Sequence, residues 1–201
     1  ISVSAFLLNR SSDLAIWTTE GFYEDYNWTI TSGTGYAGSY VDEGEYVNIG
    51  AATGNYNAGC FNHGESYWTN WLITPPMNLY GISRATLNFN FWNTNYGGNI
   101  STLKVYYRVN EGNWNLLYSN DQATADWIPV TVTLQGMAAN YQIGFECVGG
   151  DSFGMGIDDV MVTTTSTDGS WTINTHVTSP YTINSLTDNT QYVWQVQGNT
   201  T

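Results

Sequence analysis

Short runs of alternating apolar and polar residues, separated by turn residues, recur along most of this chain. In the clearest run, residues 85–92, apolar side chains fall at every second position from Ala85 to Phe91. A period of two places such side chains on one face of a β-strand. No segment shows the three- and four-residue apolar spacing of an amphipathic helix. With turn signals at intervals of roughly ten residues, the pattern predicts an all-β, two-sheet sandwich of the jelly-roll type.

The turn residues set the expected boundaries of the strands. Pro75 and Pro76 follow the run 68–74, and since proline cannot donate to a ladder we expect a strand to end there. The turn at 110–113 separates two strand-like runs and favours a hairpin. The Gly- and Asn-rich segments 33–40 and 54–63 are expected to be loops. We expect strands at 28–30, 46–50, 68–74, 85–92, 102–109, 114–118, 127–134, 141–148 and 157–162.

Charge is scarce in this chain and strongly unbalanced. Four lysines and arginines stand against 17 aspartates and glutamates, which gives a net charge of −13. Nucleic acids and anionic membranes are bound by basic surfaces, so the composition excludes both as partners. No stretch is apolar over the length that a bilayer requires, so we expect no membrane insertion. A lysine-poor chain rich in aromatic and amide side chains favours an extracellular protein.

Two segments about eighty residues apart carry a resemblance to a known family. The first, 70–79, reads NWLITPPMNL, and the second, 154–162, reads GMGIDDVMV. Together they resemble the cleaved-adhesin, or choice-of-anchor, jelly-roll modules of secreted bacterial surface proteins, which are related to MAM domains. The resemblance covers residues 20–163 and implies an extracellular adhesion or assembly module, not a standalone enzyme.

The adjacent carboxylates Asp158 and Asp159 are the candidate metal ligands. Neighbouring side chains in a strand point to opposite faces, so only one of the two can face inward. A buried carboxylate needs a partner, and calcium binds carboxylate and carbonyl oxygens. The resemblance implies a structural calcium ion held by both aspartates and an acid near the N-terminal strand, for which Glu24 is the match. In the alternative interpretation, one aspartate caps loop amides and the other is solvated.

Aromatic residues make up 15% of the chain, and three of them are candidates for ligand binding. Tyr67, Trp68 and Trp71 lie close together in sequence and could form a flat platform on which sugar rings stack. In the alternative interpretation, alternating aromatic side chains fill the core of a wide sandwich.

Cys60 and Cys147 are the only cysteines, and their spacing matches no metal-binding motif. They are either two buried thiols on neighbouring strands or a disulfide that closes a long loop. The two histidines, His63 and His176, are accompanied by no nucleophile elbow and no metal motif. We therefore expect no catalytic residues and no enzymatic activity.

The two ends of the chain differ in character from its centre. Residues 1–19 hold an alternating strand, 1–8, in front of the jelly roll, which spans residues 20–163. Residues 164–201 resemble part of a fibronectin type III module, most closely at 186–192. A partial module leaves strand edges unpaired, so the N-terminal strand of one chain could complete the C-terminal sheet of another and build filaments. The alternative is that residues 1–201 are an excerpt from a longer chain.

These observations predict that the chain is a non-catalytic adhesion or structural module on a bacterial surface or appendage. Its expected partners are copies of itself, other surface proteins and glycans. The alternative is a carbohydrate-binding module of a secreted hydrolase.

Overall fold

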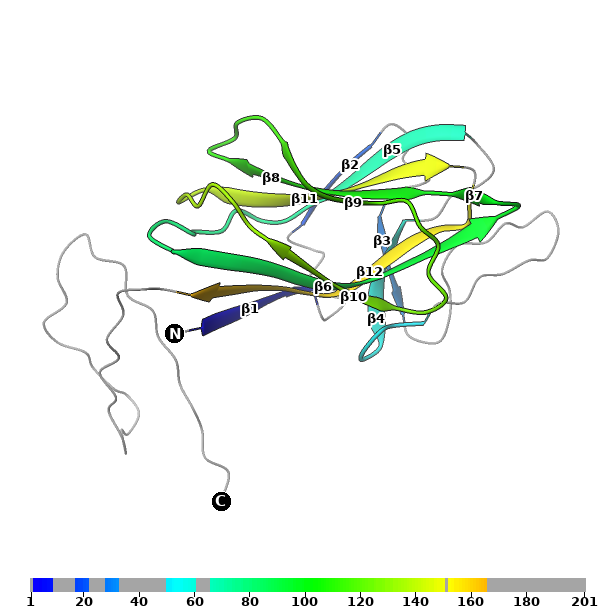
Figure 1. Ribbon diagram of the computed structural model, residues 1–201, viewed down its shortest axis with the longest axis horizontal. Helices are drawn as coiled ribbons and strands as arrows, with labels where there is room; N and C mark the ends of the chain where they lie inside the picture. The colour runs from blue at the N-terminus through cyan, green and yellow to red at the C-terminus, as the bar shows by residue number, and fades with distance from the viewer. Residues whose placement is uncertain are drawn as a thin grey trace, which may run out of the picture. The chain divides into compact units, whose positions relative to one another are not determined.

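The computed structural model describes residues 2–8, 17–21, 28–32, 50–60, 66–150 and 152–165. These residues form two antiparallel sheets that pack face to face (Figure 1). Sheet A has seven strands: β1 (Ser2–Leu8), β3 (Thr29–Ser32), β4 (Tyr56–Cys60), β6 (Arg84–Tyr96), β7 (Asn99–Ile100), β10 (Ile128–Thr133) and β12 (Gly154–Thr165). Sheet B has five strands: β2 (Thr18–Gly21), β5 (Ser66–Ile73), β8 (Thr102–Val109), β9 (Asn115–Asn120) and β11 (Tyr141–Gly150).

The strand order crosses repeatedly between the sheets, as in a jelly roll. Sheet A runs β10-β6-β12-β4-β3, with β1 against β12 and β7 against β6, and sheet B runs β2-β5-β11-β8-β9. The predicted all-β sandwich is therefore confirmed. Within the described ranges, no helix has the length and hydropathy that a membrane crossing needs.

The core lies between the two sheets and follows the alternation of the sequence. Ala85, Leu87, Phe89 and Phe91 on β6 are all buried, as the pattern predicts. Across the interface, Phe89 meets Phe145 of β11 edge to face, with ring centroids 5.4 Å apart. Most of the buried apolar residues that the structure describes belong to this one core.

The hairpin turn and the end of β5 also lie where the sequence predicted them. The β8–β9 hairpin turns at Asn110 and Glu111, which have positive φ angles of 50° and 59°. Strand β5 ends at Ile73, directly before Thr74 and the two prolines.

Strand β4, in contrast, lies in the segment 54–63 that we predicted to be a loop. Its sequence, YNAGC, lacks the branched residues that mark strands, so the prediction is wrong there. The predicted strand 46–50 lies outside the described residues except for Gly50.

The N-terminal strand, predicted to be a donor to another chain, has a place in the chain's own sheet. β1 pairs antiparallel with β12 over residues 160–165. Exchange of this strand between chains stays a prediction.

The chain divides into two units, residues 1–169 and 170–201. The fibronectin-like strands lie outside the described residues, and that resemblance also stays a prediction.

Candidate functional site

The outer face of sheet B, which points away from the core, carries the candidate site. Strand register brings Trp71 of β5, Glu146 of β11 and Lys104 of β8 into one row across the sheet. The next row contains Gly144 of β11 and Tyr106 of β8, and Leu116 of β9 follows in register. Directly opposed residues in antiparallel strands share a face, so all these side chains lie on the same side.

Three aromatic rings gather on this face, and we call Trp71, Tyr106 and Trp114 the aromatic face. The ring centroid of Trp71 lies 4.9 Å from that of Tyr106 and 5.2 Å from that of Trp114. Both pairs are tilted, with interplanar angles of 36° and 33°. Leu116, beside Tyr106, is 56% exposed, so an apolar side chain is presented to solvent next to the rings.

Gly144 lets these rings lie directly on the sheet. A Cβ atom at this position would come within 2.9 Å of the Trp71 ring and 3.1 Å of the Trp114 ring. Real Cβ atoms essentially never approach a neighbour to 2.9 Å and seldom to 3.1 Å, and a strand glycine often marks such an approach. Ile73, in register with Gly144 on the same face, is only 1% exposed. The aromatic face therefore has a packed base.

Charged and polar groups border the rings in two sets. In the first set, Glu146 Oε2 accepts a hydrogen bond of 3.0 Å from Tyr106 Oη and lies 3.7 Å from Lys104 Nζ. Burial, followed by the neighbouring Glu146 carboxylate, raises the pKa of Tyr106 to about 12. The Tyr106 hydroxyl therefore stays protonated and donates to Glu146 throughout the neutral pH range.

The second set is built on Arg108. The Cζ atom of its guanidinium lies 4.5 Å from the ring centroid of Trp114, which is a cation–π arrangement. Arg108 Nε donates to Gln142 Oε1 at 3.0 Å, and Gln142 Nε2 donates to the backbone oxygen of Thr74 at 3.0 Å. Two hydrogen bonds in series thus fix the orientation of the guanidinium.

The sequence identified part of this site. Trp71 lies on the aromatic face, while Tyr67 and Trp68 belong to β5 but their side chains lie outside the described residues. Tyr106 and Trp114 were missed. The signal for Tyr106 was available, because the alternation in residues 102–109 places it on the same face as Lys104 and Arg108.

The two adjacent aspartates lie on the opposite side of the sandwich, on the outer side of sheet A. Asp158 is 1% exposed, and its Oδ2 accepts hydrogen bonds from the backbone amides of Ala52 and Thr53 at 2.8 and 3.2 Å. Its Oδ1 accepts from the amide of Asp159 at 2.7 Å. Burial raises the pKa of Asp158 above its usual value, although these amides oppose the shift.

Asp159 lies at a bulge, where the expected alternation of side chains fails. Its φ angle is 51°, and the register between β12 and β6 shifts after Asp158. Its carboxylate accepts hydrogen bonds from Thr53 Oγ1 at 2.6 Å and Asn90 Nδ2 at 2.9 Å. Both aspartates therefore contact Thr53, and of the two only Asp158 is buried.

The hydrogen bonds of Asp158 and Asp159 can be compared with the predicted role of both residues as calcium ligands. Each of the four carboxylate oxygens already accepts a protein hydrogen bond. In the part of the chain that the structure describes, no third acid, histidine or cysteine joins the pair. Glu24, the third predicted ligand, lies outside that part. The described residues match the amide-capping arrangement, and calcium binding stays a prediction.

A shallow depression of about 440 Å³ adjoins Asp159 on sheet A. Its polar lining is uncharged apart from Asp159. Several of these groups bind one another: Thr131 Oγ1 donates to Asn88 Oδ1 at 3.0 Å, and Asn90 donates to Asp159. The lining residues are Thr53, Asn88, Phe89, Asn90, Pro129, Val130, Thr131, Asp159 and Met161.

The two cysteines face each other across the core. Cys60 on β4 and Cys147 on β11 belong to different sheets, and both are fully buried thiols. Burial, followed by a hydrogen bond with Cys147, raises the pKa of Cys60 well above its usual range. The two side chains are therefore neighbours, although their strands do not pair with each other, and the disulfide stays a prediction. His63 and His176 lie outside the described residues.

Known proteins are similar to this chain in sequence and in fold. A family model for the MAM domain (meprin/A5/mu) matches residues 11–168. The K3 cleaved adhesin domain of Lys-gingipain from Porphyromonas gingivalis has a TM-score of 0.56 at 21% identity, and the match covers 80% of this chain and 99% of that chain.

Carbohydrate-binding modules also share the architecture. TmCBM27, solved in a study of specific mannan recognition, has a TM-score of 0.54 at 12% identity over 83% of this chain and 99% of its own. TmCBM61, solved with β-1,4-galactotriose, has a TM-score of 0.51 at 10% identity, and the match covers 74% of this chain and 88% of its own. At such identities, likeness to a solved structure shows the fold alone. No curated protein matches the chain. Because the MAM family model covers more than half of the sequence, this chain belongs to the MAM domain family.

Proposed function

We propose that this chain is a non-catalytic extracellular module that attaches its parent protein to glycans through the outer face of sheet B. The observation that carries the proposal is the cluster of Trp71, Tyr106 and Trp114 on Gly144, bordered by oriented polar groups. The role combines adhesion with carbohydrate binding, the two roles expected from the sequence.

The chemistry of this face suits a sugar. A pyranose ring has an apolar C–H face and a rim of hydroxyl groups, so it is bound by flat aromatic surfaces with polar groups at their edges. The rings and the exposed Leu116 supply the apolar part. Glu146, Lys104 and Gln142 supply acceptors and donors at the border.

The positions of these groups also favour binding over a purely structural role. Trp71 and Trp114 rest on the outside of the sheet, away from the main core, and each remains partly exposed. Partly exposed aromatic side chains at the centre of a surface commonly dominate binding energies. The mannan and galactotriose named for two modules of the same fold make glycans a reasonable first class of ligand.

The proposal is tested by affinity electrophoresis and calorimetry against soluble galactan, mannan, polygalacturonate and a sulfated galactan. We expect at least one polysaccharide to bind, and Trp71→Ala and Trp114→Ala each to weaken that binding by about tenfold or more, which is about 1.4 kcal/mol. Tyr80→Ala is the matched control, because Tyr80 is 70% exposed on the turn between β5 and β6. Thermal melts of each variant confirm that it is folded.

Two results would overturn the proposal. One is an absence of binding to all four polysaccharides by the folded wild-type protein. The other is binding that neither tryptophan variant reduces more than Tyr80→Ala does.

Filament formation by strand exchange is a separate hypothesis, and it stays a prediction. Its test is the removal of residues 1–8 followed by light scattering and electron microscopy of both proteins. Filaments that disappear with the deletion would support exchange, and an unchanged assembly state would argue against it.

A further inference from the structure

The aromatic face carries an unusual share of the chain's positive charge. The whole sequence has four lysine and arginine residues and a net charge of −13. Two of those four, Lys104 and Arg108, lie on β8, one on each side of Tyr106 at alternate positions. Alternate residues of a strand share a face, so both cations border the aromatic rings.

The two cations differ in how far their charge is compensated. Lys104 lies 3.7 Å from Glu146, the carboxylate that also accepts the Tyr106 hydrogen bond. Arg108 is held by the Trp114 ring and by Gln142, which are both neutral. Among the residues that the structure describes, no carboxylate lies within ion-pair distance of Arg108.

The orientation of Arg108 leaves its binding edge available. Its Nε atom is used by Gln142, and one face of the guanidinium lies over Trp114. No hydrogen bond to a described residue occupies the two terminal nitrogens. A guanidinium presents these nitrogens as a planar fork that binds carboxylate or sulfate in a bidentate manner. Because the side chain is already fixed, little conformational entropy remains to be lost on binding.

We propose that the glycan bound by the aromatic face is acidic, and that Arg108 is the residue that recognises its anionic group. This inference rests on the proposed glycan-binding function. The anion is a uronate carboxylate or a sulfate ester, which share the chemistry that a guanidinium fork binds. The sugar ring stacks beside it on the aromatic face. The acidity of the rest of the chain does little to oppose this local contact, since exposed charges beyond roughly 8 Å are largely screened at physiological salt.

The test compares charged with neutral ligands in the wild type and in two charge variants. We expect polygalacturonate or the sulfated galactan to bind the wild type at least about tenfold more tightly than neutral galactan and mannan. Arg108→Gln is expected to weaken binding of the acidic ligand by about tenfold or more while changing binding of neutral ligands less than about threefold. Preference between polygalacturonate and sulfated galactan identifies the anionic group.

Matched controls separate charge recognition from disturbance of Trp114. Arg108→Lys keeps the charge without the fork, so we expect it to recover only part of the lost affinity. Lys104→Gln removes a cation already paired with Glu146, and we expect a smaller loss than for Arg108→Gln. Raising NaCl should weaken acidic-ligand binding to the wild type and have less effect on Arg108→Gln.

The inference fails if neutral glycans bind the wild type as tightly as acidic ones, or if Arg108→Gln weakens both classes equally. Either result would leave glycan binding itself intact, as long as the tryptophan variants still lose affinity. Failure of those variants would instead overturn the proposed function.

Discussion

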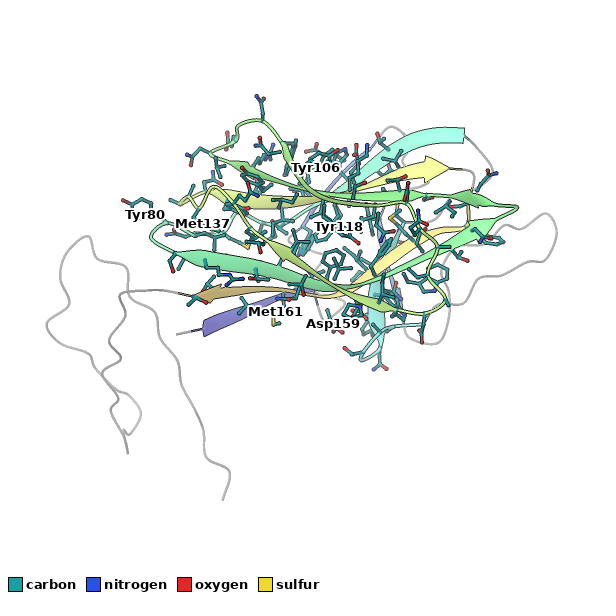
Figure 2. All side chains as sticks on the ribbon, in the orientation of Figure 1. Tyr80, Tyr106, Tyr118, Met137, Asp159 and Met161 are labelled. Atoms are coloured by element: carbon teal, nitrogen blue, oxygen red, sulfur yellow. The ribbon has the colours of Figure 1, made fainter. Side chains whose placement is uncertain are left out.

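The two outer faces of this sandwich are built on the same backbone architecture but use their polar groups differently. On sheet A, the side chains of Asn88, Asn90, Thr131 and Asp159 hydrogen-bond to one another or to Thr53. On sheet B, the Trp114 ring and Gln142 hold Arg108 with part of its hydrogen-bonding capacity unused. Figure 2 shows the two faces apart, with Tyr106 on the outer side of one layer, Asp159 and Met161 on the outer side of the other, and Tyr118 between them.

This contrast separates groups that stabilise the fold from groups that are free to bind. A polar group satisfied inside the protein gains little from a ligand, because binding only exchanges one hydrogen bond for another. A fixed donor with an open edge gives up only water when it binds, so it keeps the net gain of a charge-assisted hydrogen bond. We therefore expect substitutions on the Asp158 side to alter stability, and substitutions on the aromatic face to alter binding.

The largest expected effect is at Asp158. Asp158→Ala removes the acceptor of three backbone amides in a site that is 1% exposed. Buried donors without partners are expensive, so we expect a loss of about 3 kcal/mol or more in the free energy of unfolding. For a chain of this size that corresponds to a fall in Tm of roughly 6–12 °C.

Asp159→Ala is the matched control for this prediction. Asp159 is partly exposed and accepts two side-chain hydrogen bonds, so its loss should lower the free energy of unfolding by about 1 kcal/mol at most. Thermal and urea unfolding of both variants provide the measurement. Equal destabilisation by the two substitutions would contradict the assignment of Asp158 as the structural residue.

A second prediction concerns the link between the two sheets at Cys60 and Cys147. We expect oxidised protein to carry a disulfide here, and a reductant to lower its unfolding free energy by about 2–4 kcal/mol. The high thiol pKa leaves little thiolate in the folded state, so bridge formation should accompany folding instead of following it. The double variant Cys60→Ala, Cys147→Ala should melt at the same temperature with and without reductant. Recovery of two alkylated thiols from unreduced, unfolded protein would rule the bridge out.

A third prediction tests the packed base of the aromatic face. Gly144→Ala forces a methyl group against the rings of Trp71 and Trp114, so we expect a loss of about 1–3 kcal/mol in stability together with weakened glycan binding. In the Trp114→Ala background one clash is removed, and the same substitution should be less destabilising. Urea unfolding of the four proteins of this cycle measures the difference. An equal effect of Gly144→Ala in both backgrounds would show that the Trp114 ring does not limit the space.

The sequence predicted the architecture well because the core follows a simple period. The alternation in residues 85–92, the hairpin turn at Asn110 and the prolines after β5 each have a local cause that one chain segment carries by itself. Strand β4 was missed because its small residues gain their strand conformation from pairing with β12 and β3, which no local pattern reports.

The candidate site was predicted only in part because it depends on pairing between strands. Trp71 on β5 and Trp114, just before β9, lie far apart in sequence. They meet over Gly144 only because β11 and β8 lie between β5 and β9 in sheet B. The bulge at Asp159 likewise brings two carboxylates to one residue, Thr53, where a regular strand would separate them. Register and bulges are set by the whole sheet, so a single sequence read by pattern does not reveal them.

The smallest expected effect concerns calcium at Asp158, Asp159 and Glu24. The pKa of Asp158 is raised by burial, so the folded chain holds a proton there more tightly than the unfolded chain does. Its contribution to stability is therefore complete at low pH and is lost as the pH rises through the raised pKa. A bound cation would compensate the ionised carboxylate, so we expect calcium at ten times its Kd to add about 1.4 kcal/mol at pH 7.

Near pH 4 protons compete with the metal ion, and the added stability from calcium should shrink or vanish. Glu24→Gln should weaken the effect at pH 7 if Glu24 is a ligand, while Glu20→Gln on the exposed strand β2 should leave it unchanged. Thermal melts with calcium and with a chelator at both pH values decide the question. Identical midpoints at pH 7 would mean that the amides of Ala52, Thr53 and Asp159 alone satisfy Asp158. The sheet A face would then owe its stability to hydrogen bonds without a metal ion, and the contrast with the aromatic face would be sharper still.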